Sequence, residues 1–220
     1  MAADTDRRNV KMQSNGFTEE YWSMGPASET KGTIIFLNGC SSAGKTTLAR
    51  HLQSTLTEVY YRIAADDFMN MVDREKMRSD FYARSGEALT AMHHTVRLFS
   101  DMGLHVIVDH VLMETPQEKF AAIECVRLLR TYPVLFVKVD CDLQELERRE
   151  RERGNRQISQ ARWQREHMHS HDIYDLKLDT SRQSADECTQ QITGLLKRKA
   201  QWSAFDRLYQ IYGDTKEERG

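Results

Sequence analysis

One short segment constrains the fold of this chain more than any other. Residues 34–47 read IIFLNGCSSAGKTT, an apolar run followed directly by small residues and then by Lys-Thr-Thr. Gly39, Gly44, Lys45 and Thr46 complete the pattern G-x-x-x-x-G-K-[ST], which forms a phosphate-binding loop where it joins a strand to a helix. Small side chains let backbone N–H groups converge on phosphate oxygens, and a helix N-terminus favours the same negative charge. The segment therefore predicts a nucleoside triphosphate site.

The loop residues are expected to divide the contacts with the triphosphate among them. We expect Lys45 to reach the β- and γ-phosphates and the Thr46 hydroxyl to bind Mg²⁺. The nucleotide-binding residues expected from the loop are Gly39, Cys40, Ser41, Ser42, Ala43, Gly44, Lys45, Thr46 and Thr47. Cys40 needs only to be small, because in-line transfer of a phosphoryl group to a hydroxyl requires no covalent enzyme intermediate.

Strands and helices are expected to alternate after this loop. β-Rich runs favour strands at residues 33–38, 59–64, 105–110, 134–140 and 175–180. Helical patterns lie near residues 45–56, 86–101, 116–130, 142–153, 158–170, 184–199 and 200–211. Alternation of this kind predicts right-handed crossovers and a parallel sheet with helices on both faces. We therefore expect an α/β, three-layer P-loop NTPase fold, similar to nucleoside monophosphate kinases, with a five-stranded parallel sheet.

Composition narrows the environment and the partners. The chain has 31 Lys+Arg against 33 Asp+Glu, a net charge of −2, so no global basic field favours nucleic acid or an anionic membrane. There is no apolar run long enough to span a bilayer, and the N-terminus lacks the apolar segment of a secretory signal. We expect a cytoplasmic protein with reduced cysteines. Residues 1–31 show no sustained period and are predicted to be a mobile tail, with residues 32–220 forming a single domain.

Carboxylates follow two of the predicted strands. Asp66 and Asp67 come after the second strand, where a carboxylate would face the phosphate loop and could take a proton from an attacking hydroxyl. We favour Asp66 as this general base, and Asp67 either as the base or as the cap of a helix starting near Phe68. Asp109 ends the apolar run of the third strand and is expected to hold Mg²⁺ through water or to bind substrate. Its alternative is a surface aspartate at a strand end.

A run of arginines lies after the fourth strand. Residues 146–157 read LERRERERGNRQ, in which Arg149, Arg153 and Arg156 share one helix face. Guanidinium groups brought over the triphosphate would stabilise charge in the transition state, so we expect an arginine-rich lid at about residues 146–160. The alternative is a solvated helix in which Glu145 and Arg149 form an i, i+4 ion pair.

Several segments together resemble a known family. They are residues 39–46 (GCSSAGKT), 65–68 (ADDF), 150–156 (ERERGNR), 161–164 (ARWQ) and 174–180 (YDLKLDT), and they look like the chloramphenicol phosphotransferase-like kinases. The resemblance runs from about residue 33 to 196. It implies ATP-dependent phosphoryl transfer to a small-molecule hydroxyl. It also implies a base at Asp66, phosphate and metal contacts at Lys45 and Thr46, and lid arginines at 149, 153 and 156. The sequence departs from the family at Cys40 and in residues 72–85.

The acceptor is the part of the function that the sequence constrains least. Residues 68–92 are rich in Met, Phe and Tyr, with His93 and His94 nearby, which suits a partly apolar hydroxyl compound such as chloramphenicol. A nucleotide or other metabolite kinase of the same fold, or a nucleotide-binding switch with little turnover, remains an alternative. No feature sets the oligomeric state. The alternating His167, His169 and His171 more often mark a helix end than a metal site.

Overall fold

The computed structural model describes residues 30–153, 160–168 and 171–213. The predicted tail, residues 1–31, therefore lies almost entirely outside the described part of the chain. Within that part, no helix combines the length and the apolarity that a membrane crossing requires.

Five parallel strands form the central sheet, as the sequence predicted. They are β1 (Ile34–Asn38), β2 (Tyr60–Ala64), β3 (His105–His110), β4 (Val134–Asp140) and β5 (Leu176–Asp179). Their order is β2-β3-β1-β4-β5, so β1 lies in the centre between β3 and β4. The register pairs Leu37 with Asp109 on one side and with Val137 on the other. The phosphate loop thus leaves the sheet from its central strand.

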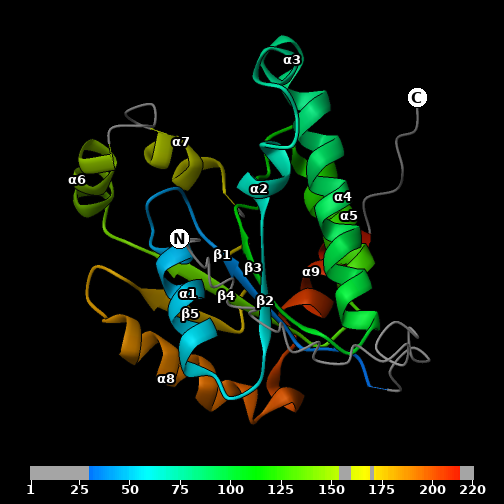
Figure 1. Ribbon diagram of the computed structural model, residues 1–220, viewed down its shortest axis with the longest axis vertical. Helices are drawn as coiled ribbons and strands as arrows, with labels where there is room; N and C mark the ends of the chain where they lie inside the picture. The colour runs from blue at the N-terminus through cyan, green and yellow to red at the C-terminus, as the bar shows by residue number, and fades with distance from the viewer. Residues whose placement is uncertain (1–29, 154–159, 169–170, 214–220) are drawn as a thin grey trace, which may run out of the picture.

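Helices cover both faces of the sheet (Figure 1). The long α4 (Phe81–Asp101), α5 (Lys119–Leu129) and α9 (Ala204–Gly213) lie on one face, and α1 (Lys45–Thr55) and α8 (Ala185–Leu196) lie on the other. Near the phosphate loop stand α6 (Leu143–Arg153) and α7 (Gln160–His167), with α2 (Ala65–Met69) and α3 (Arg74–Ser79) beyond β2. A short 3-10 turn, η2 (Lys199–Gln201), precedes α9.

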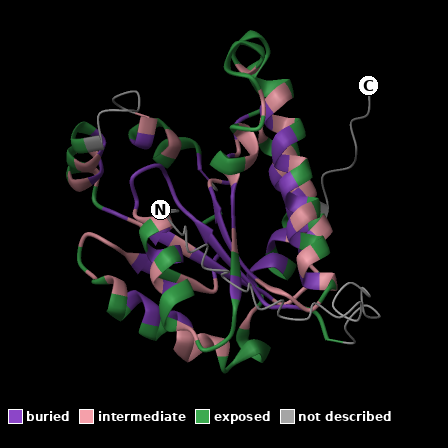
Figure 2. Cartoon of the chain, in the orientation of Figure 1, coloured by how far each residue is buried: buried purple, intermediate pink, exposed green. Residues whose placement is uncertain are grey.

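The strand β1 is buried on both faces, which explains its continuous apolar sequence. Ile34 and Phe36 pack into the cluster beneath α4, α5 and α9, whereas Ile35 and Leu37 pack into the cluster beneath α1 and α8. Figure 2 shows this burial in the strands and on the inner faces of the helices. Packing on two faces holds the C-terminal end of β1 in place, and with it the loop that follows.

The region after β2 differs from the prediction. The helix expected near Phe68 begins at Ala65, directly after the strand, so Asp67 lies in its first turn and is not its cap. The helix α3 was not predicted, and α4 begins at Phe81, five residues before the expected residue 86. Neither α2 nor α3 contains a buried residue, so neither has an apolar period that a sequence pattern could reveal.

Candidate functional site

Two glycines and a serine give the loop between β1 and α1 its shape. A Cβ atom on Gly39 would lie 2.2 Å from the carbonyl oxygen of Val139, so only glycine fits there. Gly44 (φ 92°) and Ser42 (φ 63°) adopt left-handed backbone conformations, which glycine accepts readily and serine rarely. The Ser42 hydroxyl is buried with no hydrogen-bond partner within the described residues. Such an atom suits a phosphate oxygen, so the loop fits a phosphate group.

Lys45, Thr46 and Asp109 converge beneath this loop. The Lys45 ammonium donates hydrogen bonds to the carbonyl oxygens of Gly39 (2.7 Å) and Cys40 (3.0 Å) and lies 4.0 Å from the Asp109 carboxylate. The Thr46 hydroxyl donates to the other carboxylate oxygen of Asp109 at 2.6 Å. A hydroxyl beside a carboxylate is a pair of hard oxygen donors of the kind that Mg²⁺ prefers. The structure thus brings together the two residues that the sequence proposed as metal ligands.

Arg62 is a charged residue of this site that the sequence analysis missed. It lies in β2, with one guanidinium nitrogen 3.7 Å from Asp109 and the other 2.9 Å from Asp67. Arg62 lies close to Asp109 because β2 pairs with β3, which sets Ala64 beside Asp109. No local pattern around Arg62 signals that neighbour.

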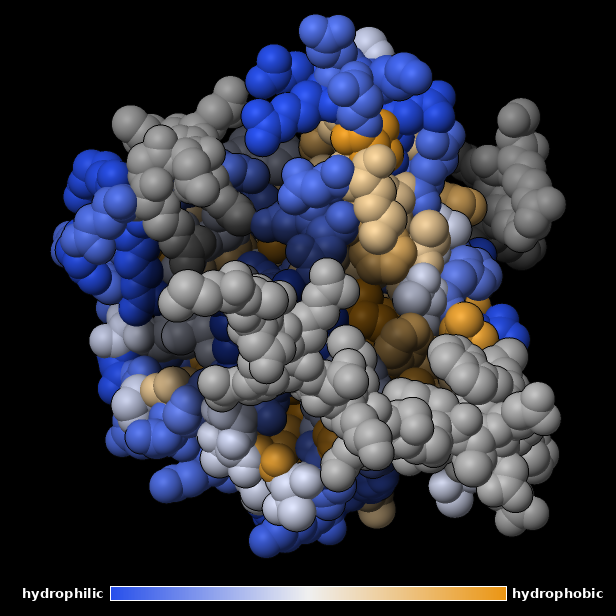
Figure 3. Space-filling view, in the orientation of Figure 1, coloured by the Kyte–Doolittle hydropathy of each residue, from blue (hydrophilic) through white to orange (hydrophobic). Residues whose placement is uncertain are grey.

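A cavity of about 320 Å³ extends from the loop along the C-terminal ends of β2 and β3. Lys45, Thr46 and Asp109 line one part of it, and Asp66 and Asp67 line another. The apolar part of its lining comes chiefly from Met69, Phe81, Leu89, Val111 and Met113. Figure 3 shows the corresponding apolar surface along the upper part of α4, beside hydrophilic side chains. The cavity therefore joins a phosphate-binding end to a mixed apolar and acidic end.

The two candidate bases are adjacent residues of α2. Both are exposed residues in the first turn of α2. Asp67 forms the ion pair with Arg62, which gives it a structural partner on β2. Both side chains lie within reach of the cavity, so the choice of Asp66 stays a prediction.

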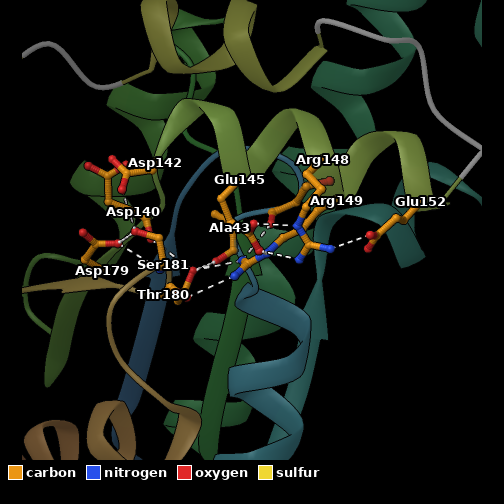
Figure 4. A network of polar contacts seen from close by, with 11 residues as sticks. Ala43, Asp140, Asp142, Glu145, Arg148, Arg149, Glu152, Asp179, Thr180 and Ser181 are labelled. Carbon is orange, nitrogen blue, oxygen red and sulfur yellow. Dashed lines mark hydrogen bonds and ion pairs between the residues drawn. The ribbon is translucent and has the colours of Figure 1, made fainter.

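Arg149 contacts the phosphate loop from α6 (Figure 4). Its guanidinium group donates to the carbonyl oxygens of Ser42 (3.3 Å) and Thr180 (3.0 Å) and to the Thr180 hydroxyl (3.1 Å). Its Nε donates to Glu145 at 2.7 Å. The predicted i, i+4 ion pair therefore exists and directs the arginine toward the loop.

The other two predicted lid arginines are not placed. Arg153 ends α6, but its side chain, like the whole of Arg156, lies outside the described residues. The arginine-rich lid at about residues 146–160 stays a prediction. What the structure does show is that the neighbouring Arg148 pairs with Glu145 and Glu152 on the exposed side of α6.

The helix α7 also contacts the loop, through a residue that the sequence analysis missed. The side-chain oxygen of Gln164 accepts a hydrogen bond from the backbone N–H of Ser41 at 2.6 Å. Buried Glu150 of α6 accepts from the backbone N–H of Ala161 at 2.7 Å and so links the two helices. Only the general position of α7 was predictable, because the contact joins residues more than 100 positions apart.

A second cavity, of about 210 Å³, lies on the other side of the loop. Its lining includes Gly44 and Leu48 near the start of α1, Arg149 of α6, and Thr180 and Cys188 around the start of α8. The Thr180 hydroxyl also donates to the carbonyl oxygen of Ala43 at 2.7 Å. These contacts tie the segment after β5 to the phosphate loop.

Burial controls the titration of two residues beside the loop. It raises the pKa of the Cys40 thiol to about 11 against the opposing charge of Lys45, so Cys40 is a protonated space-filling residue. Burial also lowers the pKa of His110 well below its usual value, and His93 and Lys45 add to this effect. The histidines after α7 form no metal-binding group within the described residues, and His169 lies outside them.

Comparison with known proteins agrees with this geometry. The sequence profile of the chloramphenicol phosphotransferase-like protein family matches residues 32–197, nearly the span of the predicted resemblance. A Mycobacterium tuberculosis protein with the provisional name O-phosphotransferase is 26% identical over 206 residues, which covers 83% of this chain and 90% of that protein.

Solved structures share the fold at lower identity. APS kinase of Mycobacterium tuberculosis, in complex with AMPPNP and APS, matches with a TM-score of 0.56 and 20% identity over 76% of this chain and 99% of that chain. Shikimate kinase of Acinetobacter baumannii gives a TM-score of 0.55 and 16% identity over 76% of this chain and 94% of that chain. The fold is thus that of P-loop kinases, and the chain belongs to the chloramphenicol phosphotransferase-like family.

Proposed function

We propose that this member of the chloramphenicol phosphotransferase-like family transfers the γ-phosphoryl group of ATP to a hydroxyl group of a small molecule. The observation that carries the proposal is the larger cavity, which joins the phosphate loop to an apolar and acidic region. Transfer in one step requires that donor and acceptor share such a space.

ATP would bind across the loop between the two cavities. The backbone N–H groups of residues 39–46 and the Lys45 ammonium suit the phosphates. The smaller cavity suits the nucleoside, because Leu48 and Cys188 offer apolar surface and Arg149 offers a flat guanidinium group. Thr46 and Asp109 would hold Mg²⁺ together with phosphate oxygens, and the ion would neutralise charge on the β- and γ-phosphates.

The transfer itself needs a group that removes a proton from the acceptor. As the acceptor oxygen forms its bond to the γ-phosphorus, the bond from that phosphorus to the bridging oxygen breaks and ADP leaves. Asp66 takes the hydroxyl proton in this step. Asp67, whose carboxylate accepts a hydrogen bond from Arg62, is the alternative base.

The charges around the larger cavity favour an acceptor without a phosphate group. Arg62, which lines the cavity together with Arg50, is paired with both Asp67 and Asp109. An anionic acceptor would have to compete with these carboxylates, whereas an uncharged hydroxyl compound would not. Apolar residues such as Met69, Phe81 and Leu89 suit the remainder of such a molecule.

The test is transfer of label from [γ-³²P]ATP with Mg²⁺ to chloramphenicol, other hydroxylated antibiotics, nucleosides, sugars and nucleoside monophosphates. Label in an uncharged hydroxyl compound supports the proposal, and Lys45→Ala should abolish it while the exposed control Lys197→Ala retains it. Label in a nucleoside monophosphate alone would instead indicate a nucleotide kinase. Tight ATP binding with no acceptor labelled would indicate a switch.

A further inference from the structure

Three titratable side chains form a hydrogen-bonded row beside the larger cavity. His93 Nδ1 of α4 lies 3.0 Å from a carboxylate oxygen of Glu124 of α5. His93 Nε2 lies 3.4 Å from Nε2 of His110, the last residue of β3. His93 has no exposed surface, and His110 is 3% exposed. Figure 1 shows α4 and α5 side by side on this face of the sheet.

The protons of this row can be assigned from its partners. An ionised carboxylate only accepts hydrogen bonds, so His93 Nδ1 must donate to Glu124. In a neutral imidazole that donates through Nδ1, the other ring nitrogen carries the lone pair. With a single proton, His93 Nε2 accepts and His110 Nε2 donates. His110 Nδ1 then carries a lone pair and is a hydrogen-bond acceptor.

This acceptor atom is left without a partner in the described protein. His110 Nδ1 is buried and forms no hydrogen bond with any described residue. His110 lines the larger cavity, one position after Asp109. Folded proteins rarely leave a buried polar atom unsatisfied, so an atom of this kind beside a cavity indicates a partner outside the chain.

We propose that His110 Nδ1 accepts a hydrogen bond from the molecule that receives the phosphoryl group, and that His93 and Glu124 hold the ring in the tautomer that this contact requires. The inference rests on the proposed function. Asp66 follows β2 and His110 ends the neighbouring β3, so each contacts a different group of the acceptor. The acceptor therefore carries a second donor, a hydroxyl or an amide N–H, besides the hydroxyl that reacts. His110 is a binding residue, and His93 and Glu124 are positioning residues.

Two substitutions at His110 separate this role from a structural one. His110→Asn keeps a hydrogen-bond acceptor at the δ position, whereas His110→Gln offers polar atoms only at the ε position, which faces His93. We expect His110→Gln to raise the KM for the acceptor about three- to tenfold, the usual effect of one lost hydrogen bond. His110→Asn should restore most of the affinity, and neither variant should change the KM for ATP.

The positioning role is tested at Glu124, which does not line the cavity. Glu124→Gln can donate as well as accept, so it no longer fixes the proton of His93. We expect it to raise the KM for the acceptor about threefold, as a weakened hydrogen bond would. The exposed Glu87→Gln is the control, because Glu87 pairs with Arg84 on the same helix and not with a histidine.

The tautomer can be observed directly by ¹⁵N NMR of the full chain labelled at histidine. The resonance of His110 Nδ1, assigned through its loss in His110→Gln, should be that of an unprotonated nitrogen. This resonance should shift when an acceptor is added, and the acceptor used is the first compound labelled in the transfer assay, with chloramphenicol tested first. It should not shift when AMPPNP is added alone.

The outcomes separate the inference from the proposed function. Transfer to a compound whose KM is unchanged in His110→Gln, or a proton on His110 Nδ1, overturns the inference and leaves the proposed function standing. Failure to label any compound refutes the proposed function and this inference with it.

Discussion

The Thr46 hydroxyl donates a hydrogen bond to the Asp109 carboxylate, with 2.6 Å between the two oxygens. Thr46 lies in the first turn of α1, and Asp109 is the next-to-last residue of β3. The register of β1 and β3 sets Leu37 beside Asp109, and so brings these ends together. A metal bound here would be held between the helix that follows the loop and the strand that pairs with β1.

Asp109→Asn should raise the Mg²⁺ concentration needed for half-maximal transfer about tenfold or more. The amide removes one negative charge from a site whose ligands are hard oxygen atoms. A magnesium titration of the labelled transfer assay measures the effect. The exposed Asp80→Asn should behave like the unaltered protein, and an unchanged titration for Asp109→Asn would contradict the metal assignment.

Asp66→Asn should reduce the rate of phosphoryl transfer by roughly two to four orders of magnitude, the usual contribution of a positioned base. ATP affinity should change little, since Asp66 acts on the acceptor. Asp67→Asn is the matched variant: it weakens the contact with Arg62 and should have the smaller effect. A large loss in Asp67→Asn alone would identify Asp67 as the base.

Arg149→Ala should lower kcat by about 10- to 100-fold, because its guanidinium group lies against the phosphate loop where charge develops. Arg148→Ala is a closely matched control. The described contacts of the Arg148 side chain are with Glu145 and Glu152, not with the phosphate loop. Steady-state kinetics with separate ATP-binding measurements distinguish a loss of rate from a loss of affinity. Equal behaviour of the two variants would refute the role of Arg149.

The protein should lose stability as the pH rises above about 9. Burial raises the pKa of Cys40 to about 11 and that of Tyr60 to about 12, so the folded state favours the protonated forms of both. Such a contribution is complete below the unfolded pKa and disappears as the pH passes the folded value. Thermal unfolding between pH 7 and 11 should show the decline, and the variants Cys40→Ala and Tyr60→Phe should each reduce its slope.

The sequence predicted those parts of the site that lie in one continuous segment. The pattern from Gly39 to Thr46 carries its own geometry, because small residues between a buried strand and a helix have few other arrangements. Asp109 was also predictable, since it ends an apolar run. The five strands followed from runs of β-branched and aromatic residues, and their parallel arrangement followed from the helices between them.

Residues whose roles depend on distant partners could not be predicted in this way. Gln164 and Thr180 reach the loop only because α7 and the end of β5 lie beside it. The sequence places His93 close to the segment expected to bind the acceptor, but it gives no partner for this side chain. The pairing of His93 with His110 arises only when α4 packs over β3.

The two cavities are formed largely by different segments of the chain. The segment between β2 and β3, which contains α2, α3 and α4, supplies most of the apolar wall of the larger cavity. The smaller cavity is formed by residues from the loop, α1, α6 and the segment around the start of α8. Related genes could therefore diverge in the compound they modify by changing one continuous stretch of codons, while the stretches that encode the nucleotide site are inherited unaltered.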